Sequence, residues 1–172
     1  MKSSTMTLLA IGLMLLPASN VLSQKATHSF GFNAASIHGF PSGEAFLTGG
    51  GAYDPESGFV KTGGAFRCLA DINQGPLSGC KAGEGIRWDA AELLPSTEFT
   101  CSGSPGEALK TAVTDGNTIV LLADFYRQGD GVDESFTAKM FVSAVDVAPD
   151  LPGIQNVWIQ GVGCGEAIAN FR

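Results

Sequence analysis

Apolar and polar residues alternate with a period of two along several segments, and this alternation predicts β-strands with one buried face. In the segment 135–147 one face carries only apolar side chains, at Phe136, Ala138, Met140 and Val142. Thr137 and Lys139 lie on the opposite face of that predicted strand. The segment 29–36 alternates aromatic and small residues, so a strand is expected there too.

The predicted strands are short, with about eight of them at intervals of roughly 10 to 15 residues. Glycine is abundant, at 23 residues, and marks the turns between these segments. The pattern favours an all-β fold, a single antiparallel β-sandwich or barrel of about eight strands. One short helix is expected at 88–95, with Asp89 as N-cap, Glu92 three residues later and Pro95 at its end.

Two glycine-rich segments, AFLTGGGAY and FVKTGGAF, share an aromatic residue, a Thr-Gly-Gly step and an Ala-aromatic pair. We expect them to form adjacent strands with matched glycine bulges. The segment 54–58, DPESG, lies between them and has the chemistry of a hairpin loop. Further along, ALKTAVT and TIVLLADFYR flank the turn residues 115–117 and predict a second hairpin.

Residues 1–23 have the pattern of a secretory signal peptide. Lys2 supplies a basic start, the apolar run 6–16 is broken by Pro17, and Val21 and Ser23 suit the −3 and −1 positions of a cleavage site. The apolar run is shorter than the roughly 20 residues of a transmembrane helix, which makes an uncleaved anchor the less favoured alternative. We therefore expect residues 24–172 to form one all-β domain that is secreted or periplasmic.

The formal net charge of the chain is −7 at pH 7. Removing the signal segment takes away one lysine and no acidic residue, so the remaining chain is slightly more acidic. The chain contains no basic run, which excludes nucleic acid and anionic membrane surfaces as expected partners. The expected partner is an unknown extracellular ligand or protein.

Four cysteines follow the signal segment, at Cys68, Cys80, Cys101 and Cys164. An even number of cysteines in an exported chain indicates two disulfides, for which three connectivities exist. Pairing Cys68 with Cys80 and Cys101 with Cys164 is slightly preferred, because the first bridge would close the turn-rich segment LADINQGPLSG. Zinc is the alternative, but the short spacings typical of cysteine zinc ligands are absent.

The segment 124–136, DFYRQGDGVDESF, concentrates acidic residues between two predicted strands. Its turn formers favour a solvated hairpin loop. Calcium, the one candidate cofactor, is the alternative, because this ion binds clustered carboxylate and carbonyl oxygens. Its candidate ligands are Asp124, Asp130, Asp133 and Glu134. The spacing does not fit an EF-hand, and Arg127 inside the segment favours an ion pair.

A second acidic cluster, Glu84, Asp89 and Glu92, surrounds Trp88. Two carboxyl groups facing each other across a sugar site would allow glycoside hydrolysis. The structural interpretation is stronger, with Trp88 in the core and Asp89 as a helix cap. Trp88 and Trp158 are also candidates for stacking on a ligand, although a tryptophan near a disulfide usually packs in the core.

Nucleophilic catalysis has little support in the sequence. The chain has two histidines, His28 and His38, both near the start of the exported part, and it lacks a G-x-S-x-G motif. Disulfide-bonded cysteines offer no thiolate nucleophile. The glycine-rich stretches match neither phosphate-binding pattern, G-x-x-x-x-G-K-[ST] or G-x-G-x-x-G at the start of a helix.

The segments GGGAYDPESGFVKTGGAFRC, DFYRQGDGVDESFTAKM and VWIQGVGCG resemble segments of small exported bacterial all-β proteins. The resemblance spans most of residues 24–172 and implies a bacterial exported β domain, without implying an activity. The function expected is therefore non-catalytic, with a binding or structural role outside the cytoplasm. A calcium-stabilised binding domain and a small secreted carboxylate-dependent carbohydrate hydrolase are the two alternatives.

Overall fold

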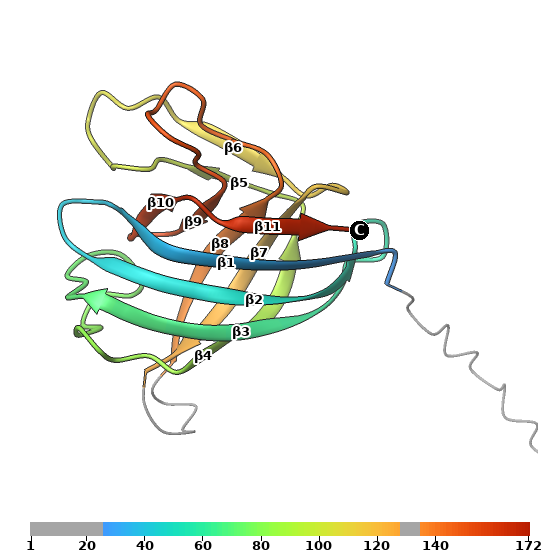
Figure 1. The fold of residues 1–172 in the computed structure, drawn as a ribbon, viewed down its shortest axis with the longest axis horizontal. Coiled ribbons are helices and arrows are strands. Elements are labelled where there is room, and N and C mark those ends of the chain that lie inside the picture. Colours follow the sequence, from blue (N-terminus) through green and yellow to red (C-terminus); the bar gives the residue numbers. More distant parts are fainter. Residues whose placement is uncertain (1–25, 128–134) are drawn as a thin grey trace, which may run out of the picture.

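A computed structural model describes residues 26–127 and 135–172 (Figure 1). The described residues contain strands and no helix, which confirms the all-β prediction. The predicted signal segment lies outside the described residues. The strands are β1 (His28–Gly39), β2 (Glu44–Asp54), β3 (Phe59–Ala70), β4 (Arg87–Leu94), β5 (Ser96–Phe99), β6 (Lys110–Val113), β7 (Thr118–Tyr126), β8 (Ser135–Ser143), β9 (Val157–Ile159), β10 (Gly163–Gly165) and β11 (Ile168–Phe171).

The large sheet closes on itself. Its strand order is β10-β9-β8-β7-β4-β3-β2-β1-β11, and every neighbouring pair is antiparallel. The last residues of β1 also pair with β10, at His38↔Cys164 and Gly39↔Gly163. The ring therefore contains eight strands, and β11 adds to the first half of β1. Strands β1, β2 and β3 curve in front of β7 and β8 (Figure 1).

The main core fills the inside of the ring. Alternate residues of each strand point inward, as the period-two pattern predicts, and bring together large side chains such as Phe32, Leu47, Phe66, Trp88 and Phe125. Phe66 and Phe125 meet edge to face across the ring, with centroids 5.0 Å apart. Burying aromatic and aliphatic side chains together provides the main stabilisation of the ring.

A second, smaller core lies on the outer face of the ring. Strands β5 and β6 form a separate two-stranded sheet. They cover the outward side chains of β7, β8 and β9, where Phe99 packs on Phe141 with ring centroids 4.7 Å apart. Strand β7 is therefore buried on both faces over its first half, which explains why TIVLL is a continuous apolar run rather than an alternating one.

The helix predicted at 88–95 is wrong, because this segment forms β4. Trp88 and Leu93 both enter the main core, and a bulge at Ala91 brings them to the same face of the strand. Seven residues of β4 pair with β7. A helix of one or two turns is marginal without tertiary support, so sheet pairing outweighs the local capping signal at Asp89.

The two predicted hairpins have different outcomes. The glycine-rich segments do pair as β2 and β3, with Gly49↔Gly64 and Gly50↔Gly63, but the register is regular there and the predicted glycine bulges are wrong. A Cβ at Gly49 would lie 2.5 Å from the carbonyl oxygen of Gly63 and 2.7 Å from the Trp88 ring. These glycines therefore allow close packing inside the ring.

The second hairpin, predicted between 108–114 and 118–127, is also wrong. The turn forms, since the Asp115 N–H donates to the Thr118 carbonyl at 2.9 Å. The two strands then diverge into different sheets, because β6 pairs with β5 and β7 pairs with β4 and β8. The apolar side chains of β7 lie on both of its faces, so both faces must be buried. A hairpin with β6 would pair only with the backbone edge of β7 and would leave one face uncovered.

Candidate functional site

The two disulfides follow the slightly preferred pairing. Cys68 bonds to Cys80, and Cys101 bonds to Cys164, closing segments of 12 and 63 residues. Two disulfides indicate an oxidising compartment. Within the described residues there is no helix of the length and apolarity needed to span a membrane.

The structure brings together two carboxylates that the sequence placed in different clusters. Asp89 on β4 lies directly opposite Asp124 on β7. Asp124 accepts a hydrogen bond from Thr137 at 2.5 Å, and Asp89 lies 3.8 Å from the Arg87 guanidinium. Burial and then the negative charges of Asp89 and Asp124 raise the pKa of the neighbouring Tyr126 hydroxyl.

The other acidic candidates are separated from this pair or fall outside the described residues. Glu84 forms an ion pair with Arg127 at 3.3 Å, and Glu92 is exposed on β4 beyond the bulge. Asp130, Asp133 and Glu134 lie outside the described residues. The described part of the chain contains no group of three or more metal-ligating side chains close enough to hold an ion.

Both candidate ligand-stacking tryptophans are buried. Trp88 is 1% exposed inside the ring, and its indole N–H donates to the Thr48 carbonyl at 3.0 Å. Trp158 is 4% exposed in the second core, and its indole N–H donates to the Thr100 carbonyl at 3.0 Å. Both rings are therefore packed inside the protein, and both indole N–H groups already donate hydrogen bonds to backbone carbonyls.

A groove of about 690 Å³ lies beside the Cys101–Cys164 disulfide and is here called the disulfide groove. Outward residues of β1 form one side, while β10 and the start of β11 form another. Two loops, 100–109 between β5 and β6 and 144–156 between β8 and β9, contribute the remaining lining. The residues are Asn33, Ala35, Ser36, His38, Gly39, Cys101, Ser102, Leu151, Pro152, Gly153, Ile154, Gln155, Cys164, Gly165, Glu166 and Ile168.

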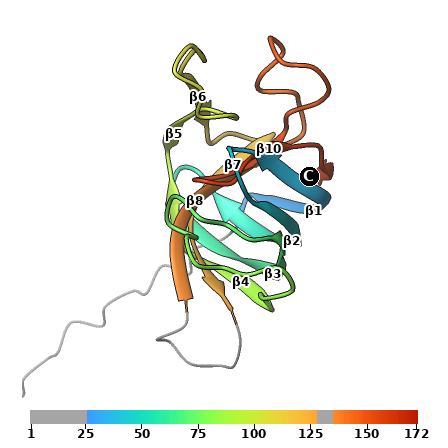
Figure 2. The ribbon, with the colours of Figure 1, turned by 90° about the vertical axis from the view of Figure 1, so that its left-hand side faces the viewer.

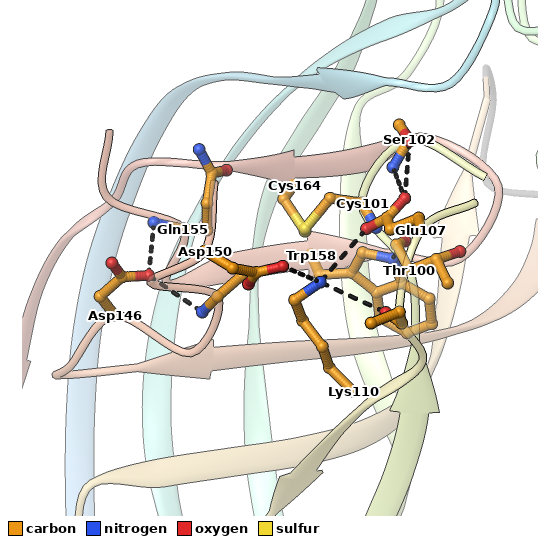
Figure 3. Close-up of a disulfide and its surroundings, with 12 residues drawn as sticks. Thr100, Cys101, Ser102, Glu107, Lys110, Asp146, Asp150, Gln155, Trp158 and Cys164 are labelled. Carbon is orange, nitrogen blue, oxygen red and sulfur yellow. Dashed lines mark hydrogen bonds and ion pairs between the residues drawn. A yellow bond between two sulfur atoms is a disulfide. The ribbon is translucent and has the colours of Figure 1, made fainter. Parts of the chain in front are cut away.

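The two loops project from the same side of the sheet (Figure 2). An ionic network joins them, as Figure 3 shows, and it runs from the buried Glu107 through Lys110 to Asp150, whose side chain is 54% exposed. The Lys110 amine lies 3.0 Å from the Asp150 carboxylate and 3.6 Å from the Glu107 carboxylate. The side chains of Lys110 and Glu107 are only 11% and 5% exposed, so solvent screens their interaction weakly.

Glu107 also fixes the backbone next to the disulfide. Its carboxylate accepts hydrogen bonds from the Cys101 N–H at 2.5 Å and the Ser102 N–H at 2.7 Å. Burial alone would raise the pKa of this carboxyl. The hydrogen bonds from Ser102 and Cys101 and the charge of Lys110 outweigh that effect and hold the Glu107 pKa below its ordinary value.

Changing Glu107 to glutamine tests this network through pH. A lowered folded-state pKa stabilises the protein above the pKa of the unfolded carboxyl, and this contribution disappears as pH falls through the folded-state pKa. At pH 7 we expect E107Q to lower the free energy of unfolding by about 1–3 kcal/mol. The difference from the parent protein in thermal denaturation should shrink below about pH 4.

E56Q, in the exposed β2–β3 turn, is the control and should match the parent protein at every pH. A stability difference for E107Q that stays constant down to pH 2 would contradict the role of the ionised carboxylate.

A side chain replaces strand pairing next to the groove, between β10 and β11. Asn156 is buried, and its amide group donates to the Ala167 carbonyl at 3.0 Å and accepts from the Ala167 N–H at 2.7 Å. This pair of bonds holds the segment between β10 and β11, where the chain passes along β1. These bonds therefore fix the backbone beside Gln155, Glu166 and Ile168, which line the groove.

The two hydroxyl groups of the lining are bound to carboxylates. Ser36 donates to Glu44 at 2.6 Å, and Ser102 donates to Glu107 at 2.6 Å. Among the residues that the structure describes, no hydrogen bond joins His38 to either hydroxyl. Both hydroxyl groups therefore already donate hydrogen bonds to carboxylates within the protein.

Sequence reasoning did not predict this groove. Its lining comes from β1, the β10–β11 segment and two long loops that are far apart in the chain. The one available signal was the cysteine pair, since the preferred bridge already joined residue 101 to residue 164. Ala35 and Ile154 carry no motif that would single them out.

No protein-family model, curated protein or solved structure matches this chain. The assignment of function therefore depends on the geometry and chemistry of the described residues.

Proposed function

We propose that this protein is an exported, non-catalytic binding domain, secreted or periplasmic, and that the disulfide groove is its ligand site. The observation that carries the proposal is the groove of about 690 Å³ beside Cys101 and Cys164. This volume lies within the usual range of about 300–1,000 Å³ for pockets that bind small ligands. The two disulfides support the extracytoplasmic location.

The walls of the groove are held in place before any ligand arrives. The disulfide ties loop 100–109 to β10, and Lys110 links that loop to Asp150 in loop 144–156. Within loop 144–156, the Asp146 carboxylate accepts hydrogen bonds from the Ala148 and Gln155 N–H groups at 3.0 and 3.1 Å. A preorganised site loses less conformational entropy on binding, which favours affinity.

The lining supports binding of a partly apolar ligand. Ala35, Leu151, Ile154 and Ile168 offer apolar contact, while His38, Gln155 and Glu166 supply a few polar groups. Such a combination of apolar surface with sparse polar groups is typical of ligand pockets. The hydroxyl groups already bound to carboxylates support the non-catalytic part of the proposal.

A fragment screen by ligand-observed NMR tests the proposal. We expect several fragments to bind the parent protein and to lose binding in A35W, because this indole would occupy the groove from the exposed face of β1. A65W, at an exposed position on β3 outside the groove, is the matched control and should retain binding. Equal fragment binding by A35W and the parent protein, or no binding at all, would overturn the proposal.

The two alternative functions remain predictions. Three of the four proposed calcium ligands lie outside the described residues. The carboxylates proposed for sugar hydrolysis are partly committed to structural contacts, since Glu84 pairs with Arg127. The disulfide groove is favoured over both because the Cys101–Cys164 disulfide and the Lys110–Asp150 ion pair tie its walls together.

A further inference from the structure

We propose that the ligand of the disulfide groove is an extended peptide that adds as a strand to the open edge of β11, with a basic side chain facing Glu166. This inference rests on the proposed function and specifies the class of ligand. Three features of the described residues carry it: the hydrogen-bonding pattern of β11, the apolar residues beside it and the charge at its start.

The register of β11 shows which backbone groups face outward. Ser29 and Arg172 exchange both backbone hydrogen bonds, at 2.8 and 2.9 Å. Because such pairs alternate along an antiparallel ladder, Asn170 and Ile168 also direct their N–H and C=O groups toward β1. Ala169 and Phe171 therefore direct their N–H and C=O groups to the opposite edge.

No strand in the described part of the chain pairs with that opposite edge. Ala169 and Phe171 are half-buried, and their outward donors and acceptors, unpaired by any described strand, have the spacing that another extended backbone requires. Natural edge strands usually carry charged residues that discourage such pairing. Strand β5 follows this rule with Glu98, whereas the four residues of β11, IANF, are uncharged and the charged Arg172 follows only at the far end of the ladder from Glu166.

Apolar side chains border the open edge. Ile168, the first residue of β11, is 77% exposed, and Ile154 in loop 144–156 is 46% exposed. Both residues line the disulfide groove. Alternate side chains of an added strand would point to the same face, so valine or isoleucine at alternate positions could contact these two residues.

The charge of the groove favours a basic peptide. Glu166 is exposed and directly precedes β11, and within the described residues its carboxylate has no ion pair or hydrogen bond. Two other carboxylates near the groove, Glu107 and Asp150, are paired with Lys110, while Glu44 and Asp146 accept hydrogen bonds from Ser36 and from the Gln155 N–H. A lysine or arginine of the peptide would meet an unpaired negative charge at Glu166 in an overall acidic protein.

The test uses an acetylated and amidated peptide, KVTVTVK, titrated into isotope-labelled protein with amide hydrogen exchange as the readout. We expect the Ala169 and Phe171 amides to exchange quickly in the free protein and to become protected when the peptide binds. The Gly31 and Asn170 amides should be slow in both states. N-methylating the internal peptide residues should weaken binding at least about tenfold, because backbone hydrogen bonds are lost.

Charge is tested with a matched pair of variants. E166K should weaken binding of the peptide about five-fold. E92K, which makes the same charge change at an exposed position of β4, far from β11 in the strand order, should leave the affinity within about two-fold of the parent value. Thermal denaturation checks that both variants fold. Equal effects of the two variants would overturn the assignment of Glu166.

The outcomes separate this inference from the proposed function. Fragment binding without peptide binding, or peptide binding without protection of Ala169 and Phe171, would overturn strand addition and leave the groove as a binding site. Protection of these amides that depends on protein concentration alone would identify a second copy of the chain as the occupant and overturn the peptide. Absence of both fragment and peptide binding would overturn both proposals.

Discussion

Replacing Cys101 and Cys164 together by serine is expected to lower the free energy of unfolding by about 4 kcal/mol, because the bridge closes a long segment of the unfolded chain. The bridge spans 63 residues and joins loop 100–109 to β10. The same loop-closure relation gives about 3 kcal/mol for the bridge between Cys68 and Cys80, which spans 12 residues. Chemical denaturation of both double variants gives the comparison.

The two double variants should also differ in binding. Cys101 and Cys164 line the disulfide groove, so their replacement should abolish fragment binding even at temperatures where the variant is folded. Cys68 and Cys80 lie outside the groove lining, so fragment binding should survive in that variant. Greater destabilisation by the shorter bridge, or equal loss of binding in both variants, would contradict this account.

Replacing Trp88 by alanine is expected to lower the free energy of unfolding by about 3–5 kcal/mol. Trp88 is 1% exposed, contacts the Phe32 ring and occupies space that Gly49 leaves free. The substitution removes this apolar contact and leaves a cavity that the ring of strands cannot close. It also removes the indole N–H from the buried Thr48 carbonyl.

W88F separates the two contributions. W88F keeps an aromatic ring in the core but loses the hydrogen bond to the Thr48 carbonyl. We therefore expect W88F to lower the free energy of unfolding by about 1–3 kcal/mol, less than W88A does. Urea denaturation with far-UV circular dichroism measures both variants. If W88A unfolds within 1 kcal/mol of the parent protein, about the net value of a single hydrogen bond, the placement of Trp88 inside the ring is wrong.

Most strands were predictable because the polarity of each side chain indicates whether its position is buried or exposed. The alternation at Phe136, Ala138, Met140 and Val142 reflects one buried face of β8, and that pattern is readable without knowing the partner strands. The disulfide pairing was also anticipated, since the segment between Cys68 and Cys80 is rich in turn formers. The predicted count of about eight strands matches the ring, to which β11 and the β5–β6 sheet are added.

The errors occurred where distant contacts outweigh local preference. The Asp89 capping signal spans four residues, whereas β4 is held by pairing with residues of β7 that lie 26 to 39 positions later in the chain. The turn at Asp115 was identified correctly, but a turn does not determine which strands lie on each side of it in space. The second core decided that β6 leaves β7 and joins β5.

By itself the sequence determined an all-β chain with an even set of cysteines, because residue periodicity and cysteine number are local properties. Only the tertiary structure decided the closure of the ring, the pairing of Asp89 with Asp124 and the existence of the disulfide groove. The groove depends on strand register and on two loops joined by Lys110 and Asp150. Such contacts between distant segments leave no periodic pattern in the sequence, so they emerge only when the chain is folded.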